Sequence, residues 1–348
     1  MTATVRPAAV TRDRRGKVPD VCVIALGGTV ATGLDGQPSI GLHALLDAFG
    51  PHLPRVNLRA IDLARVPSPG LRLANAARVA RLAIEQVAEG CHGVVVLQGT
   101  DTIEEFAFAL DLLYQQAAPL IVTGAMVAPH QAGSDAASNL ASALRVAAAP
   151  QMRGVGCVVV LNDEIHTARA VRKTDTSSRA AFASHPFGPL GHVTEGLVTL
   201  DRKPVTRVRL PGSVRRSQPV SLLSASMDDD LRVATCLDSL GYRGLVVAGL
   251  GGGHLPASAV ENVSQALAAM PVVLASRAGG IGLRDTYGYP GSERDLLGRG
   301  LLYAGDLAPA KARVALSLLL GAGLSGEDLG RSFHEVAWPQ GRRRKAVR

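Results

Sequence analysis

The sequence predicts an α/β protein of two domains: a larger N-terminal domain with a parallel-rich sheet flanked by helices, and a smaller C-terminal α/β domain. Short valine-rich apolar runs alternate along the chain with longer alanine- and leucine-rich segments. Buried strands that alternate with helices are typical of parallel sheets covered on both faces. The length of 348 residues also exceeds what one hydrophobic core usually supports.

The expected strands are β-branched runs, each followed by glycine or a small polar residue. In chain order they are residues 21–26, 94–97, 120–124, 155–161, 245–249 and 271–276. The helices expected between them repeat apolar residues with helical spacing. They cover residues 74–89, 103–116, 134–148, 228–240 and 256–269.

Residues 201–219 interrupt this alternation. They contain three prolines and six basic residues and lack an apolar core of their own. We therefore expect an interdomain connection or an exposed hairpin there. The expected division is a disordered basic tail at 1–19, an N-terminal domain at 20–205, a linker at 206–217, a C-terminal domain at 218–340 and a basic tail at 341–348.

The formal net charge of +8 comes from the two ends of the chain. Residues 1–19 contribute +4 and residues 341–348 contribute +5, which leaves −1 for everything between them. A nearly neutral body does not favour a nucleic-acid partner, and the charged ends are expected to be solvated tails.

Membrane insertion and secretion are not indicated either. The chain lacks the ~18 consecutive apolar residues of a membrane span, and its N-terminus lacks the apolar segment of a secretory signal. The widely spaced cysteines indicate neither a disulfide framework nor a zinc site. They are Cys22, Cys91, Cys157 and Cys236. We expect a cytoplasmic protein.

Ligands of open α/β sheets bind beyond the carboxyl ends of the strands, so the segments that follow the strands are informative. GGTVATG, after the first strand, lacks the Lys-Ser/Thr pair of a phosphate-binding loop, and GLGGGH has its third glycine misplaced for dinucleotide binding. GxSxG and HExxH do not occur, and the nine histidines lack metal-ligand spacing. Nucleotide binding and metal-assisted hydrolysis are therefore not favoured.

Hydroxyl and charged side chains remain as candidate chemical groups. Thr29 follows two glycines after the first strand, Thr100 and Asp101 follow the second, and Lys173 follows the fourth. A threonine becomes nucleophilic when a neighbour takes its proton, and a lysine balanced by a carboxylate could organise that transfer. Structural interpretations stay open, because Asp101 and Thr102 also suit a helix N-cap and Lys173 also suits the surface.

Several motifs, in order, resemble the bacterial-type L-asparaginase (asparaginase/glutaminase) family. ALGGTVA at 25–31 and LQGTDTIEE at 97–105 are similar to its two signature segments. The similarity continues through TGAM at 123–126, VVLNDEIHTARAVRKTDT at 159–176 and LAPAKARVALSLLL at 307–320. It covers nearly all of residues 20–335.

The resemblance implies an amidohydrolase that converts L-asparagine to L-aspartate and ammonia through a threonine acyl-enzyme. By position, Thr29 matches the nucleophile of the family, and Thr100, Asp101 and Lys173 match its second catalytic cluster. The family has active sites completed across a dimer interface, which implies a homodimer or homotetramer. L-Glutamine is a possible second substrate, and neither a metal nor an organic cofactor is implied.

The resemblance also implies substrate-binding residues. Ser68 matches the serine that holds the α-carboxylate, and Thr100 and Asp101 also belong to the binding set, with Asp101 paired to the α-ammonium. Ala125 matches the residue whose backbone carbonyl faces the amide group. Four positions depart from the family pattern, with different residue types at Leu26, Pro69, Gln98 and Val127.

A fifth departure concerns the proton partner of Thr29. The family commonly has a tyrosine in the loop after the first threonine, whereas residues 31–41 contain none. RDTYGYPGSE at 284–293 occupies the region where the family supplies residues to the partner subunit. We expect Tyr287, and next Tyr289, to act there, although both also suit ordinary loop packing.

Two other functions remain open. One is a related amidase, either a glutaminase or the ammonia-generating subunit of a tRNA amidotransferase. Such a subunit usually has an extra N-terminal domain, whereas about twenty residues precede VCVIALGG here. The other is a catalytically silent amino-acid-binding protein, which would explain the missing tyrosine but would not need Lys173.

Overall fold

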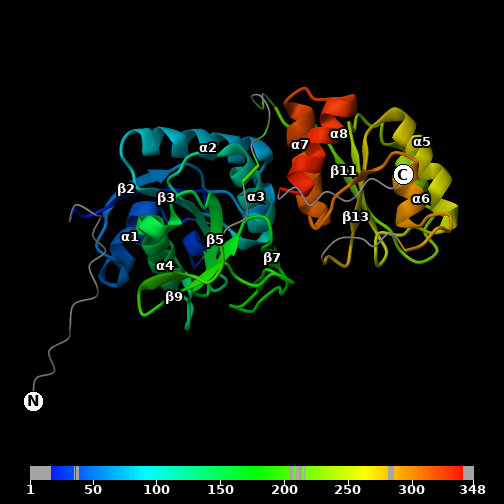
Figure 1. Cartoon of the computed structure of the whole chain (residues 1–348). Coiled ribbons are helices and arrows are strands. Elements are labelled where there is room, and N and C mark those ends of the chain that lie inside the picture. Colours follow the sequence, from blue (N-terminus) through cyan, green and yellow to red (C-terminus); the bar gives the residue numbers. More distant parts are fainter. Residues whose placement is uncertain are drawn as a thin grey trace, which may run out of the picture. The chain divides into compact units, whose positions relative to one another are not determined.

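The chain divides into two compact units, residues 1–204 and 205–348, which are coloured along the sequence in Figure 1. The computed structural model describes residues 17–339 except 35, 37–38, 204–206, 209, 211–213, 215 and 281–285. The tails expected at 1–19 and 341–348 lie wholly or largely outside the described residues, and so does half of the linker expected at 206–217.

The N-terminal unit is built on an eight-stranded sheet with the order β10-β9-β6-β5-β4-β3-β1-β2. Its parallel part consists of β1 (Asp20–Ala25), β2 (Asn57–Asp62), β3 (Gly93–Leu97), β4 (Leu120–Thr123) and β5 (Cys157–Leu161). Antiparallel strands extend the sheet beyond β5, namely β6 (Glu164–Thr167), β9 (Gly191–Thr194) and β10 (Leu197–Leu200). The expected parallel-rich sheet is confirmed.

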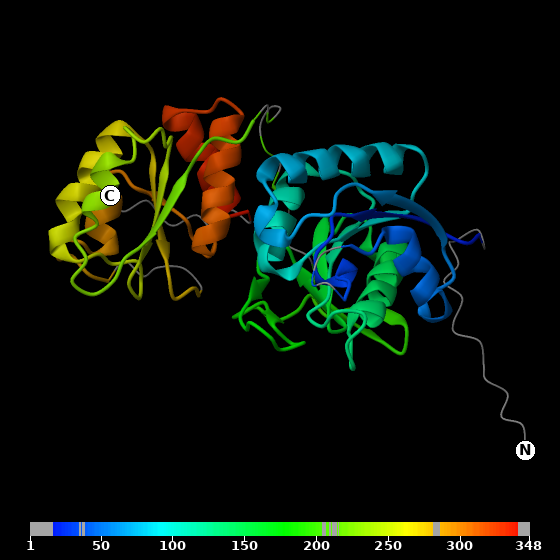
Figure 2. The same cartoon turned by 180° about the vertical axis from the view of Figure 1, so that it is seen from behind.

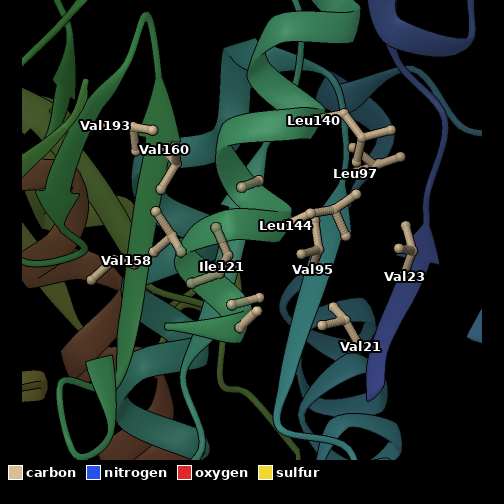
Figure 3. Close-up of a cluster of buried hydrophobic side chains, with 14 of the residues drawn as sticks. Val21, Val23, Val95, Leu97, Ile121, Leu140, Leu144, Val158, Val160 and Val193 are labelled. Carbon is tan, nitrogen blue, oxygen red and sulfur yellow. The ribbon is translucent and has the colours of Figure 1, made fainter. Parts of the chain in front are cut away.

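Helices cover both faces of this sheet, which is why its central strands read as unbroken apolar runs. On one face, alternate strand residues such as Val23, Val95 and Ile121 pack in one cluster with Leu140 and Leu144 (Figure 3). The helices on this face are α1 (Leu42–Phe49) and α4 (Ala136–Ala148). The opposite face carries α2 (Leu73–Ala88) and α3 (Ile103–Leu113), as Figure 2 shows from behind.

The strand order places a switch point between β1 and β3. β2 pairs with one edge of β1, and β3 pairs with the other, so the chain leaves β1 toward one side and later returns on the opposite side. In open α/β sheets such a reversal opens a crevice at the carboxyl ends of the two strands, and ligands bind there. The segments after Ala25 and Leu97 border this crevice.

Strand β5 returns to β6 through Asn162 and Asp163, whose φ angles of 51° and 59° are typical of a tight hairpin turn. The segment after β6 forms a small second sheet of β7 (Arg172–Lys173) and β8 (Phe182–Ala183). In it, Lys173 pairs with Phe182. Lys173, which the sequence placed after the fourth strand, therefore lies on a strand of its own.

The C-terminal unit has a parallel four-stranded sheet. Its strands, in sheet order, are β11 (Ser221–Ser224), β12 (Leu245–Gly249), β13 (Val272–Ser276) and β14 (Leu302–Tyr303). Its helices are α5 (Val260–Ala269), α6 (Glu293–Gly298), α7 (Pro309–Gly321) and α8 (Gly326–Ala337). The smaller α/β domain expected from the sequence is confirmed.

The helix expected at 228–240 is wrong. Only a 3-10 helix, η6 (Arg232–Cys236), forms there. Asp228 and Leu231 adopt φ angles of 63° and 51°, a left-handed conformation that does not continue a right-handed helix. Leu231 and Leu237 still pack in the core of this unit. The spacing of apolar residues therefore predicted which side chains are buried, but it was wrong about the α-helix.

Candidate active site

Two glycine-containing loops come into contact at the switch point. Gly28, with a φ of 87°, follows β1, and a Cβ atom placed on it would overlap the backbone nitrogen of Gly99. A Cβ atom on Gly99 would in turn lie 2.8 Å from Ser68 Oγ and 3.1 Å from Gly28 Cα. Glycine is therefore required on both sides of this contact.

This contact places the two candidate threonines on adjacent turns. Thr29 is the first residue of the 3-10 helix η1 (Thr29–Ala31), directly after Gly28, and it is partly buried. Thr100 begins the equivalent η4 (Thr100–Thr102), directly after Gly99, and it is 5% exposed. The closeness of the glycine backbones thus brings the two threonine-bearing segments together.

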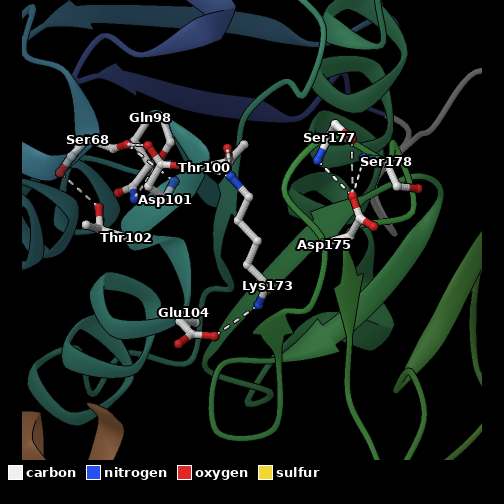
Figure 4. A network of polar contacts seen from close by, with 11 residues as sticks. Ser68, Gln98, Thr100, Asp101, Thr102, Glu104, Lys173, Asp175, Ser177 and Ser178 are labelled. Carbon is white, nitrogen blue, oxygen red and sulfur yellow. Dashed lines mark hydrogen bonds and ion pairs between the residues drawn. The ribbon is translucent and has the colours of Figure 1, made fainter.

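Ser68 and Asp101 join a third loop to the site (Figure 4). The Ser68 hydroxyl donates to Asp101 Oδ2 at 3.2 Å, and its oxygen accepts from the Asp101 N–H at 3.3 Å. Thr102 Oγ1 donates to the Ser68 carbonyl at 3.2 Å. Ser68 begins η3 (Ser68–Gly70) and is buried, so the segment after β2 is fixed against the segment after β3.

Lys173 reaches the same cluster from β7. Its Nζ donates to Thr100 Oγ1 at 2.9 Å and to Asp101 Oδ1 at 2.7 Å. Its backbone N–H donates to Glu104 Oε2 at 3.0 Å, so the start of α3 anchors the base of the side chain, as Figure 4 shows. The Lys173 side chain is 17% exposed, which is incompatible with the alternative of an ordinary surface lysine.

The geometry defines which atoms donate. A charged ammonium has only donors, so Thr100 Oγ1 acts as acceptor toward Lys173, and its own hydroxyl hydrogen is not used in that hydrogen bond. Only a deprotonated Lys173 could take a proton from Thr100. The cluster can therefore move one proton between a hydroxyl and an amine that are already in hydrogen-bond contact.

The pKa of Asp101 lies below its usual range, chiefly because Lys173 donates a hydrogen bond to the carboxylate and supplies a nearby positive charge. The Ser68 hydroxyl acts in the same direction, whereas partial burial opposes the shift. Asp101 is consequently an ionised carboxylate at neutral pH. Its side chain is 58% exposed, so it is open to a cationic ligand group.

Ala125 lies at the end of the neighbouring strand β4. A Cβ atom on the preceding Gly124 would overlap the carbonyl oxygen of Gln98 and lie 3.4 Å from Thr100 Cγ2. The loop after β4 is therefore packed on the loop that carries Thr100. Gln98, one of the departures from the family pattern, is fully buried and donates weakly to the Gly99 carbonyl at 3.4 Å.

Tyr287 and Tyr289 lie in the C-terminal unit, around one histidine. Their ring centroids are 5.3 and 5.7 Å from that of His254, and the residues are 50% and 45% exposed. Nearby Glu293 is 1% exposed, and within the described part of the chain its carboxylate oxygens have no hydrogen-bond partner. The contact expected between Tyr287 and Thr29 of a partner subunit stays a prediction.

Sequence reasoning missed three polar residues that hold the site loops, namely Glu104, Asp135 and Asn139. Glu104 lies in the first turn of α3 and accepts a hydrogen bond from the backbone N–H of Lys173. Asp135 and Asn139 are buried residues four positions apart on one face of α4. That spacing, just after TGAM, was a signal that could have identified them.

Two further features concern the described residues, namely metal-ligating clusters and membrane-spanning helices. No three histidine, cysteine, aspartate or glutamate side chains in that part of the chain come together as a metal-binding group. None of the helices in the same part combines the length and the apolar character needed to cross a membrane.

Comparison with known proteins covers almost the whole chain. A sequence model of the family "Asparaginase, N-terminal" matches residues 20–206, and one of the "Glutaminase/Asparaginase C-terminal domain" matches residues 220–333. The chain is 33% identical over 333 residues to a probable L-asparaginase of Deinococcus radiodurans, spanning 91% of this chain and 97% of the relative.

Two further relatives agree. The L-asparaginase of Bacillus licheniformis is 31% identical over 311 residues, which cover 86% of this chain and 95% of the relative. The crystal structure of a probable cytoplasmic L-asparaginase from Campylobacter jejuni superposes with a TM-score of 0.81 at 27% identity, covering 91% of this chain and 99% of that one. Both halves of the sequence and the fold thus agree, and the chain belongs to the asparaginase family.

Proposed function

We propose that this protein hydrolyses L-asparagine to L-aspartate and ammonia, with Thr29 as the nucleophile. The observation that carries the proposal is the contact of Lys173 with both Thr100 and Asp101, beside the Gly28–Gly99 junction. A hydroxyl, an amine and an ionised carboxylate at a strand switch point supply acid–base chemistry and a cation-binding group together. A binding protein would need the carboxylate but not the partly buried lysine.

The substrate is oriented by its α-amino and α-carboxylate groups. Asp101 pairs with the α-ammonium through its exposed oxygen surface, in a charge-assisted contact. Ser68 can turn its hydroxyl hydrogen from Asp101 to the α-carboxylate while its oxygen still accepts from the Asp101 N–H. The carboxamide then extends toward Thr29 and Ala125.

The reaction proceeds in two displacements. Thr29 Oγ1 attacks the carboxamide carbon as its proton leaves for an acceptor, and the C–N bond breaks with proton transfer to nitrogen, which releases ammonia. Water then attacks the acyl-threonine ester, gives aspartate and restores the Thr29 hydroxyl. Thr100 and Lys173 act as one proton-transferring pair during these steps.

The proton acceptor of Thr29 is assigned to a second subunit. We propose a homodimer or homotetramer in which Tyr287, or failing it Tyr289, approaches the Thr29 of a partner. The half-exposed phenols support this assignment, because their hydroxyls are accessible to a second subunit. Glu293 lies beside them, with Oε2 at 3.7 Å from His254 Nδ1, and its buried carboxylate oxygens make no hydrogen bond within the described residues.

A cytoplasmic location is proposed as well. The related protein from Campylobacter jejuni is described as a probable cytoplasmic L-asparaginase, whereas a relative from Haemophilus influenzae is named periplasmic. Fractionation of the producing cells, with immunodetection of the protein, distinguishes the two compartments. Recovery with periplasmic markers would contradict the proposal.

Ammonia release from purified protein tests the proposed activity. L-Asparagine and L-glutamine are supplied separately, because one added methylene is worth about 1–3 kcal/mol of discrimination in a fitted pocket. We expect faster release from asparagine. Preference for glutamine would make the protein a glutaminase, and binding of L-aspartate without ammonia from either amide would indicate a silent amino-acid-binding protein.

A further inference from the structure

Asp135 holds two consecutive backbone amides of the loop that follows β4. Its Oδ1 accepts from the N–H groups of Met126 at 3.1 Å and Val127 at 2.9 Å, and its Oδ2 accepts from Met126 at 3.1 Å. Asp135 occupies the N-cap position of α4, yet its carboxylate accepts no capping hydrogen bond from the backbone N–H groups of that helix. The side chain thus holds the loop and does not cap the helix.

Asn139 holds the same loop one helical turn later. Its Nδ2 donates to the Gly124 carbonyl at 3.0 Å and to Asp135 Oδ2 at 2.9 Å. Its Oδ1 accepts from the backbone N–H of Asn162 at 3.0 Å, which ties the ends of β4 and β5 together. Asn139 is 1% exposed, so these hydrogen bonds do not compete with bulk water.

Together the two side chains fix the backbone on both sides of Ala125. A peptide group is planar and trans, so its N–H and C=O point in opposite directions. The N–H of the Ala125–Met126 peptide is directed to Asp135, and the Ala125 carbonyl is therefore directed away from that carboxylate. Within the described part of the chain, no group donates a hydrogen bond to the Ala125 oxygen.

The Ala125 carbonyl thus needs a donor from outside the described residues. A buried carbonyl without a partner costs about 1–3 kcal/mol, so the loop is held in a conformation that a ligand or water donor would relieve. The preceding Gly124 is packed against Gln98 and Thr100, so Ala125 is one residue from the loop that carries Thr100. A substrate carboxamide offers N–H donors there, whereas the corresponding ester offers none.

We propose that Asp135 and Asn139 are positioning residues that aim the Ala125 carbonyl at the NH₂ group of the substrate carboxamide. The inference rests on the proposed carboxamide hydrolysis. The hydrogen bond from the amide nitrogen to Ala125 strengthens as that nitrogen gains a proton and positive charge before leaving as ammonia. The carbonyl therefore stabilises the transition state more than the bound substrate.

The test compares hydrolysis of L-asparagine with that of L-aspartate β-methyl ester, using the full-length protein. Asp135→Ser keeps a residue suited to an N-cap but is too short to hold Met126 and Val127. We expect it to lower the amide-to-ester ratio of kcat/KM about tenfold, the effect of one lost hydrogen bond. Asp135→Asn, which keeps the Oδ1 acceptor, should restore part of that ratio.

Ser142→Ala is the matched control. Ser142 lies on the same face of α4 and donates to Asp163 Oδ1 at 2.7 Å, but that hydrogen bond holds the loop after β5, which does not carry Ala125. The control should leave the amide-to-ester ratio unchanged. If Asp135→Ser does not fold, Asn139→Ser, which releases the Gly124 carbonyl, is measured in the same way with the same expected fall.

The outcomes separate the inference from the function on which it rests. Two results with an active wild type would overturn the positioning role alone. One is an equal loss of kcat/KM toward the amide and the ester in the folded Asp135 and Asn139 variants. The other is no loss of kcat/KM in those variants. A wild type that hydrolyses neither the amide nor the ester would overturn the proposed function and the positioning role together.

Discussion

The backbones of Gly28 and Gly99 are in contact where β1 and β3 end, with no room for a side chain on either residue. This contact joins two turns that are separated by about seventy residues of sequence. Each glycine directly precedes a candidate threonine. The separation between the two threonine hydroxyls is therefore set by main-chain packing, which is stiffer than any side-chain contact.

Substitution of Gly28 by alanine should consequently damage both fold and activity. The added Cβ atom overlaps the Gly99 backbone and also forces a φ of 87° on an L-residue. Gly154→Ala is the control, because Gly154 has a φ of 85° with nothing within 4 Å of the added atom. We expect the free energy of unfolding, measured with denaturant, to fall by about 1 kcal/mol in the control and by about 3 kcal/mol or more in Gly28→Ala. An equal fall in both variants would mean that the Gly28–Gly99 contact is loosely packed.

Removal of the nucleophilic hydroxyl should separate activity from stability. Thr29→Ala is expected to abolish ammonia release, because no other hydroxyl occupies the start of η1, while its unfolding midpoint stays within a few degrees of wild type. Thr29→Ser keeps the hydroxyl and should keep partial activity. Turnover of Thr29→Ala near the wild-type rate would show that the first motif has been assigned wrongly.

Lys173 and Asp101 should behave as one unit with Thr100. Because Lys173 Nζ contacts both partners, Lys173→Met and Asp101→Asn should each lower kcat by a similar factor, and the double variant should lose little more. Asp101→Asn should also raise KM through the α-ammonium. Lys203→Met, at an exposed lysine, is the control and should retain full activity. Strictly additive losses in log kcat would argue against coupling.

The lowered pKa of Asp101 predicts how stability depends on pH. The folded-state pKa lies below the usual 3.8, so the stabilisation is complete above that value and is lost as pH falls through the folded-state pKa. We expect the free energy of unfolding of the wild type to exceed that of Asp101→Asn by less than about 1 kcal/mol at pH 7, because the Asp101 side chain is largely exposed. Unfolding at several pH values should show this difference shrinking below pH 3.8, and a growing difference would contradict it.

The central strands could be predicted because strands buried on both faces have continuous apolar sequences, such as the valine run from Val94 to Val96. Exposed or short strands were missed, because β2 and β10 carry mixed polarity and β7 has only two residues. The expected helix at 228–240 does not form, because Asp228 and Leu231 adopt positive φ angles, which the spacing of apolar residues cannot reveal.

Some residues of the candidate site could also be predicted from sequence, and others could not. Residues directly after buried strands, such as Thr29 and Thr100, could be identified from sequence because strand ends fix their place. Lys173 needed the family resemblance, since its approach to Thr100 depends on a two-stranded sheet that periodicity cannot reveal. Asp135 and Asn139 are spaced for one helix face, but that spacing does not reveal which backbone groups their side chains hold.

The last prediction concerns the phenol that is absent from residues 31–41. If Tyr287 receives the Thr29 proton across a subunit interface, Tyr287→Phe should lower kcat about 100-fold, as the loss of a general base does, without changing the oligomeric state. Tyr289→Phe should have a smaller effect. Tyr242→Phe, at a tyrosine packed against the core of the C-terminal unit, is the control and should retain its activity.

Two measurements check this assignment, steady-state kinetics with size-exclusion chromatography and a structure of the assembled protein with substrate bound. The base must lie within ~2.6–3.2 Å of the Thr29 hydroxyl, directly or through one water. If both tyrosine hydroxyls lie more than ~10 Å from every Thr29 hydroxyl of that assembly, neither can serve. The proton acceptor would then be water or a residue of the loop after Thr29, such as Thr32, whose hydroxyl donates to the Gly28 carbonyl at 3.1 Å and so already lies at this turn.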